Sequence, residues 1–142
     1  MSEQQYAGFW IRVVASIIDT IFLLIVLLAI VFALYSAGLI TDNPDDLGMA
    51  GIFLNYIIPL ILVLIFWHYK SATPGKIITH ISIVDAETGG KPSSRQFIIR
   101  YIAYYISAIP LLLGFIWVGF DQRKQGWHDK LAKTVVIKTN PN

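Results

Sequence analysis

Residues 9–35, FWIRVVASIIDTIFLLIVLLAIVFALY, decide the fold, because they form one long apolar run that contains only two charged residues, Arg12 and Asp19. Read as a helix from about residue 9 to 37, the run is roughly 43 Å long, which is enough to cross a bilayer. A charged side chain at the centre of a spanning helix costs at least ~2.5 kcal/mol on insertion scales. We therefore expect Arg12 and Asp19 to face other protein groups rather than lipid.

The composition of the whole chain places it among α-helical membrane proteins. The 142 residues are 56% hydrophobic and 14% charged, whereas soluble domains carry roughly 25% charged residues. The length predicts one domain over residues 1–142. The chain has no cysteine, its three histidines have no ligand spacing, and no glycine-rich phosphate loop or catalytic motif is present. We therefore expect no metal, no cofactor, no enzyme activity and no nucleic-acid binding.

Three apolar segments organise the chain, at about residues 9–37, 49–69 and 97–120. The first two predict spanning helices. The third has Pro110 and Gly114 near its middle, which favours a re-entrant helical hairpin, with a single spanning helix as the alternative. Alternating residues predict surface strands at about 77–85 and 134–138, and these form a small cytoplasmic β-hairpin or sheet.

The distribution of basic residues predicts the orientation. The loop at 38–48 contains three aspartates and no Lys or Arg, whereas the 70–96 loop contains four basic residues and the tail at 121–142 contains five. We expect the protein to lie in the inner membrane. By the positive-inside rule, the N-terminus, the 70–96 loop and the tail then face the cytoplasm. A re-entrant third segment keeps both basic regions on that side.

Four residues of the first helix, Arg12, Ala15, Ser16 and Asp19, share one face because they are spaced three or four positions apart. The small residues between the two charges allow another element to approach closely. Asp19 lies about 10 Å deeper than Arg12, so it needs a different partner. The side chains that we consider as members of a charged network or transport site are Arg12, Asp19, Asn55, Arg100, His128 and Asp129. Lys76 is a further candidate partner of Asp19. Of these, Asp129 is a candidate to pair with Arg12 or Arg100.

Three stretches together resemble the RDD family of small bacterial membrane proteins: FWIRVVASIID, TPGKIITHISIVDAETGGKPSSRQFIIRY and QGWHDKLAKTVVI. The resemblance covers about residues 7–138. It implies that Arg12 and Asp19 are the family's arginine and first aspartate, and that the second aspartate is Asp129, with Asp85 as the other possibility. His80 stands where the family pattern leads us to expect a glycine. Monovalent cation/proton antiport is one role that has been proposed for the family.

Two functions are compatible with these observations. In the first, an oligomeric bundle moves protons or monovalent cations through the Arg/Asp site, because intramembrane acids often mark ion or proton pathways. In the second, the chain is a membrane scaffold or assembly factor that binds a protein partner or anionic lipid through its basic cytoplasmic face. The expected partners are therefore the lipid bilayer, further copies of the chain and another membrane protein.

Overall fold

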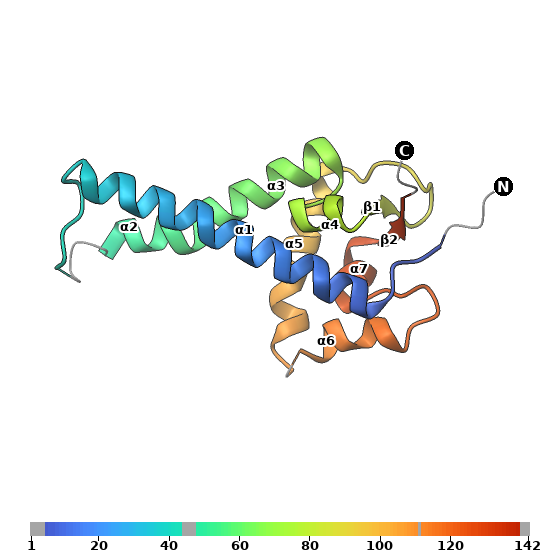
Figure 1. The fold of residues 1–142 in the computed structure, drawn as a ribbon. Helices are drawn as coiled ribbons and strands as arrows, with labels where there is room; N and C mark the ends of the chain where they lie inside the picture. Colours follow the sequence, from blue (N-terminus) through green and yellow to red (C-terminus); the bar gives the residue numbers. More distant parts are fainter. Residues whose placement is uncertain (1–4, 44–47, 111, 140–142) are drawn as a thin grey trace.

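The computed structural model describes residues 5–43, 48–110 and 112–139. Two of the three aspartates of the 38–48 loop, Asp45 and Asp46, lie outside the described residues. The part of the chain that is described is mainly helical, with one small sheet. Figure 1 shows an elongated pair of helices on one side, and shorter helices, the sheet and both chain ends on the other.

Two helical stretches are long and apolar enough to cross a membrane, among the residues described. The first is α1 (Phe9–Ser36), in which an 18-residue window has a mean hydropathy of 3.0. The second runs through α2 (Gly48–Ile52), the π-helical turn η2 (Phe53–Ile57) and α3 (Ile58–Lys70), and it returns alongside α1 (Figure 1). The prediction of two spanning helices is confirmed.

The π-helical turn has a local cause. Pro59 lies at the start of α3 and has no backbone N–H, and its ring would clash with the carbonyl of Asn55 in a regular α-helix. Widening the preceding turn relieves this clash and lets the apolar stretch continue. Asn55 lies in that turn, and its side chain is exposed and donates a 2.8 Å hydrogen bond to the Gly51 carbonyl.

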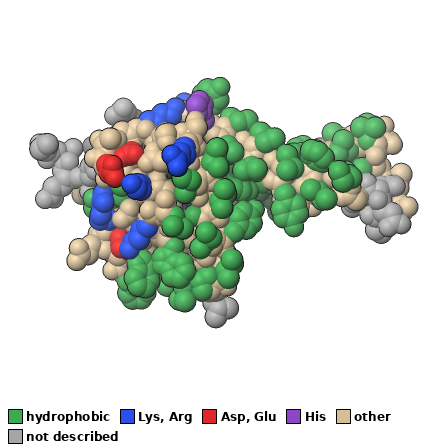
Figure 2. Space-filling model, turned by 180° about the vertical axis from the view of Figure 1, so that it is seen from behind, with side chains coloured by type: hydrophobic (Ala, Val, Ile, Leu, Met, Phe, Trp, Pro, Cys, Tyr) green, Lys and Arg blue, Asp and Glu red, His purple; other side chains and the backbone are tan. Residues whose placement is uncertain are grey.

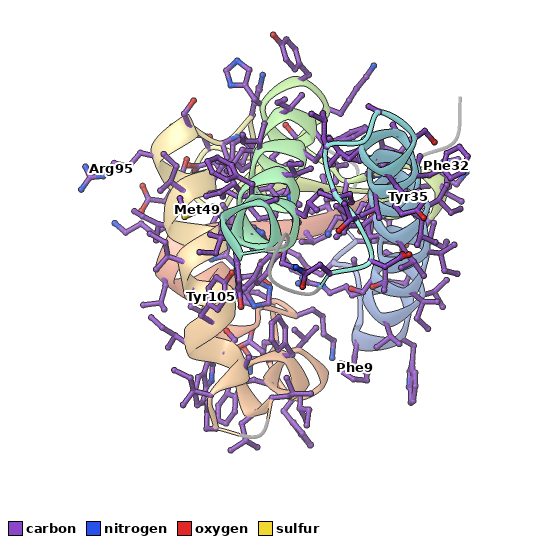
Figure 3. All side chains as sticks on the ribbon, turned by 90° about the vertical axis from the view of Figure 1, so that its left-hand side faces the viewer. Phe9, Phe32, Tyr35, Met49, Arg95 and Tyr105 are labelled. Carbon is purple, nitrogen blue, oxygen red and sulfur yellow. The ribbon has the colours of Figure 1, made fainter. Side chains whose placement is uncertain are left out.

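The third apolar segment is a bent pair of helices and not one straight helix. It consists of α5 (Ser94–Ala108), α6 (Leu113–Ile116) and the 3-10 turn η3 (Trp117–Gly119), with a bend of 112° between the first and the last two. In Figures 1 and 3, α5 runs crosswise to the direction of α1. A Ser93–Gln96 capping box begins α5.

Both ends of the bent pair reach the same part of the molecule. Gln96 Nε2 donates to the carbonyl of Lys133 at 3.2 Å, and after the second arm Arg123 Nη2 donates to the carbonyl of Ala86 at 2.8 Å. The chain therefore leaves the region of the sheet and returns to it, which is the path that a re-entrant segment requires.

The sheet contains two antiparallel strands, β1 (Ile81–Asp85) and β2 (Thr134–Lys138), with Ile83 opposite Val136. The first strand is shorter than predicted, because residues 74–78 form the helix α4 (Pro74–Ile78) and not the beginning of a strand. Pro74 fits the first turn of a helix. The alternating isoleucines of 77–83 therefore belong to two different elements.

The buried core lies where α1, α3, α5 and the sheet meet. Trp67 is fully buried there with Phe97, Ile83 and Val136, and its ring contacts Phe97 at a centroid distance of 5.6 Å. By contrast, α1 exposes half of its large apolar side chains, and Ala15 is its one buried residue. Figure 2 shows hydrophobic side chains over the elongated helix pair and charged side chains gathered at the opposite end. This division is that of a protein partly embedded in lipid.

Candidate functional site

An ion-pair cluster joins the start of α1, helix α5 and helix α7 (Trp127–Ala132). Arg12 Nη1 donates to Asp129 Oδ2 at 2.6 Å, and Arg100 Nη1 donates to Asp129 Oδ1. Asp129 is fully buried, as is Arg100, and the Arg12 side chain is 11% exposed. One carboxylate is thus shared by two guanidinium groups from distant parts of the sequence.

Local structure supplies the remaining hydrogen bonds of this cluster. The backbone N–H of Gly126, at the start of α7, donates to Asp129 Oδ2 at 2.9 Å. Arg12 also donates from Nε to the Ala7 carbonyl at 3.0 Å and from Nη2 to the Lys124 carbonyl at 2.5 Å. These contacts matter because a buried ion pair is stable only if its other donors and acceptors are also satisfied.

The two charged arginines determine the protonation state of the cluster. Burial raises the pKa of Asp129, but the positive charges of Arg100 and Arg12 outweigh burial and hold this pKa well below its usual value. The carboxylate is therefore ionised at neutral pH.

The neighbouring His128 ring forms an aromatic cluster with Tyr104 and Phe115, with ring centroids 4.6 Å and 5.1 Å from its own. Burial lowers the pKa of His128 to about 3, assisted by the charges of the nearby arginines and opposed by the negative charge of Asp129. This histidine is therefore neutral at physiological pH.

Asp19 occupies a second position, separate from this cluster. It accepts a 2.5 Å hydrogen bond from the Thr73 hydroxyl and a 2.7 Å hydrogen bond from the backbone N–H of Gly75, in the first turn of α4. The Lys76 ammonium donates to the same Thr73 hydroxyl oxygen at 3.3 Å. Among the described contacts of Asp19, both donors are neutral.

The contact between α1 and α4 depends on small residues. A Cβ atom added to Gly75 would lie 2.0 Å from the carbonyl oxygen of Ala15 and 3.0 Å from the Asp19 carboxyl carbon. Ala15 is fully buried by this contact. The small-residue face of α1 therefore allows the α4 backbone to reach Asp19.

A groove of about 840 Å³ connects the two positions. Its walls come from α1, α3, α4, the bent pair and α7, and its polar lining includes Arg12, Asp19, Lys76 and Arg100. Most of the other lining residues are apolar. Figure 3 labels two of the lining residues, Phe9 at the start of α1 and Tyr105 on α5. A groove of this size is within the range of ligand sites in proteins.

The residues singled out from the sequence therefore divide into three groups. Arg12, Arg100, His128 and Asp129 lie together, and Asp129 makes both of the pairings considered for it. Asp19 lies apart from them but lines the same groove, and the Thr73 hydroxyl connects it to Lys76. Asn55 is not part of either arrangement, because it bonds to its own helix.

Sequence reasoning did not single out Thr73 and Gly75 as partners of Asp19, or Thr134, whose hydroxyl accepts a 2.7 Å hydrogen bond from Arg100 Nη1. For Asp19 a signal was present. The Thr-Pro-Gly sequence is typical of a helix start, and a helix N-terminus offers free N–H groups to a carboxylate. For Thr134 no such signal exists in the sequence.

Two apolar helical stretches, a bent third segment and a buried Arg/Asp cluster define a small helical membrane protein. The family model of the RDD family matches residues 6–133, and the chain belongs to that family.

Similar proteins include the uncharacterized protein YxaI of Bacillus subtilis, which is 32% identical over 92% of this chain and 96% of its own length. The uncharacterized membrane protein YteJ of the same organism is 29% identical over 93% of this chain and 80% of its own. The uncharacterized protein RP437 of Rickettsia prowazekii is 40% identical over 52% of this chain, which corresponds to 40% of that protein's length. No solved structure matches the chain.

Proposed function

We propose that this protein exchanges protons for monovalent cations across the inner membrane, without enzymatic chemistry, and that Asp19 is the carboxylate that carries them. The supporting observation is that Asp19 is the one carboxylate among the described residues that line the groove. Its hydrogen-bond donors, Thr73 and Gly75, are uncharged. Protonation of Asp19 therefore breaks no direct ion pair among the described residues, whereas protonation of Asp129 would break two.

The surroundings of Asp19 suit exchange of one positive species for another. Its carboxylate and the Thr73 hydroxyl present oxygen atoms, which are the ligands that hard cations prefer. The Lys76 ammonium already contacts that hydroxyl, so an incoming cation competes with an internal one. A proton, a cation and Lys76 can then alternate as the positive charge nearest to Asp19. Some of the residues that line the groove, such as Ile17 and Ile21, are exposed, so a single chain does not enclose it and we propose that further copies complete the pathway.

The orientation follows from the charge distribution. We propose that the N-terminus, the 70–96 loop and the tail face the cytoplasm, because these segments carry the basic residues. Asp19 then lies closer to the cytoplasmic side than to the outer side of α1.

The test is cation/proton exchange in proteoliposomes, followed with a pH-sensitive dye inside the vesicles. Wild type is compared with Asp19→Asn and with Asp42→Asn, an exposed loop residue whose replacement changes the charge equally. All three proteins must be folded and reconstituted in equal amounts. We expect dye signals on addition of Na⁺ or K⁺ for wild type and Asp42→Asn, and none for Asp19→Asn. Equal exchange in all three, or none in wild type, would refute the proposal.

A second candidate function is that of a scaffold that binds a membrane-protein partner or anionic lipid through its basic end. The observation that favours it is the gathering of exposed Lys and Arg side chains at the end of the molecule that contains the sheet (Figure 2). The double substitution Lys91→Glu and Arg95→Glu reverses two exposed charges there. The scaffold function would be favoured by two results together: wild type shows no cation/proton exchange, and a partner that co-purifies with wild type is lost from this variant.

A further inference from the structure

The groove has an excess of positive charge. Three cationic side chains, Arg12, Lys76 and Arg100, and one carboxylate, Asp19, line it among the described residues. Asp129 lies behind the two arginines and neutralises one of them, and His128 is neutral. Together these five charged groups carry a net charge of +1. A buried surplus charge is unfavourable unless a counterion is present, so the groove is complementary to an anion.

Two hydrogen-bond donors in the groove wall also lack an acceptor. Trp67 Nε1 and Arg100 Nε are buried and have no hydrogen-bond partner within the part of the chain that the structure describes. Both residues line the groove. A buried donor without an acceptor costs about 1–3 kcal/mol. Two such donors beside a surplus positive charge indicate that an oxygen-rich, negatively charged group completes this region.

The rest of the groove is suited to hydrocarbon. Ile17, Ile21, Tyr105, Leu112 and Ile116 line it, and each is more than 40% exposed. Ile17 and Ile21 lie on the spanning helix α1 and the others on the bent pair. The rim of the groove is therefore open towards the lipid that surrounds these helices, and a ligand with an apolar chain can enter from the bilayer.

We propose that the groove binds one anionic phospholipid, with its phosphate next to Arg12, Lys76 and Arg100 and an acyl chain along Ile17 and Ile21. Arg12 is near the start of α1, at headgroup depth, and Ile21 lies about 13 Å further along the helix axis. The polar and apolar parts of the groove thus follow the order of a lipid molecule in the leaflet. Basic pockets between membrane helices are known to hold anionic headgroups.

The occupant is a lipid and not a soluble anion, because the apolar lining makes up most of the groove and its rim is on lipid-exposed elements. The proposal goes beyond cation/proton exchange and does not depend on it. A lipid bound beside Lys76 would provide a counterion for that ammonium without contact with Asp19.

The experiment measures lipid binding to the detergent-purified protein by native mass spectrometry and by the rise in its melting temperature. The probes are phosphatidylglycerol, phosphatidylcholine and glycerol 3-phosphate. Wild type is compared with Lys76→Gln, which removes one groove charge, and with Lys138→Gln, which removes an exposed charge elsewhere. Ser16→Phe is a further variant, because Ser16 is exposed and lines the groove, so a larger side chain there fills the groove without disturbing the core.

We expect phosphatidylglycerol to bind equally to wild type and Lys138→Gln, and at least fivefold more weakly to Lys76→Gln and Ser16→Phe. Phosphatidylcholine should bind more weakly than phosphatidylglycerol, and glycerol 3-phosphate should not shift the melting temperature. Equal binding of phosphatidylglycerol to all four proteins, or equal binding of the two lipids, would overturn the proposal. Binding of glycerol 3-phosphate as tight as that of the lipid would overturn the assignment to a lipid.

Discussion

Arg12 and Asp129 are 117 residues apart in the sequence, and they form a 2.6 Å ion pair that joins the start of the first spanning helix to α7. Arg100 binds the other oxygen of the same carboxylate. The pair therefore connects three segments that would otherwise be held mainly by apolar contacts. Burying these charges has a desolvation cost, which the shared carboxylate and the surrounding hydrogen bonds offset.

The first prediction concerns the substitution Asp129→Asn. It leaves two guanidinium groups beside a neutral amide in a buried site, and removing one partner of a buried ion pair typically costs about 3–5 kcal/mol. The same change at Asp121 is the control, because its bond to Lys130 is partly exposed, and such pairs contribute at most about 1 kcal/mol. Thermal unfolding in detergent measures both variants.

If the cluster acts as a unit, Asp129→Asn combined with Arg12→Gln should cost less than the sum of the single substitutions, since the two residues touch. Strict additivity, or an equal loss for the Asp121 variant, would contradict this account.

The second prediction concerns pH and His128. Its pKa is about 3 in the folded protein because of burial, and about 6.5 in an unfolded chain. Between these values the unfolded chain binds one more proton, so the free energy of unfolding falls as the pH decreases from about 6.5, by about 1.4 kcal/mol per pH unit at most. The substitution His128→Phe keeps a ring against Tyr104 and Phe115 and removes the titrating group.

We therefore expect the melting temperature to decrease more steeply from pH 7.5 to 4.5 for wild type than for His128→Phe. Asp129 does not contribute to the pH dependence between 7.5 and 4.5. Its pKa is about 3.9 in an unfolded chain and lower in the folded protein, so the stability that it provides is lost only below about pH 4. Parallel pH profiles for the two proteins would show that His128 is not the group responsible.

The sequence was sufficient to predict the apolar segments and the small sheet, because the segments follow from hydropathy and the strands from alternating residues. It also made Asp129 a candidate to pair with Arg12 or Arg100, and both pairs are present. It was not sufficient to find the partners of Asp19, since one of them is a backbone N–H of Gly75, 56 residues away. Asn55 lies apart from the Arg/Asp cluster and from Asp19, because its polar side chain bonds to the carbonyl four residues earlier in its own helix. The alternation of Ile77 with Ile81 and Ile83 predicts a strand that includes residues 77 and 78, which are the last two residues of helix α4.

The third prediction concerns His80, which stands where the family pattern suggested a glycine. Its φ is +52°, a left-handed conformation that costs a residue with a Cβ atom about 1–2 kcal/mol. Replacing it by glycine removes this cost but adds about 0.5–1 kcal/mol of chain entropy. We expect His80→Gly to stabilise the protein by about 0.5–1 kcal/mol in thermal unfolding, and His80→Ala to bring no such gain, because alanine keeps the Cβ atom. Equal effects of the two substitutions would argue against backbone strain at this position.

The fourth prediction concerns Gly75→Ala. The added methyl group would lie 2.0 Å from the Ala15 carbonyl oxygen, so α4 must move away from α1. Overpacking of this kind costs about 1–3 kcal/mol, and the movement also withdraws the Gly75 N–H from Asp19. Gly119→Ala is the control, because a methyl group there meets no atom within 4 Å.

Both effects of Gly75→Ala can be measured. Because the chain has no cysteine, spin labels at Ser16→Cys and Thr79→Cys report the distance between α1 and α4. We expect that distance to increase and the melting temperature to fall for Gly75→Ala, with neither change for Gly119→Ala. An unchanged distance would mean that α4 does not depend on this contact for its position, and that the Gly75 N–H stays within reach of Asp19.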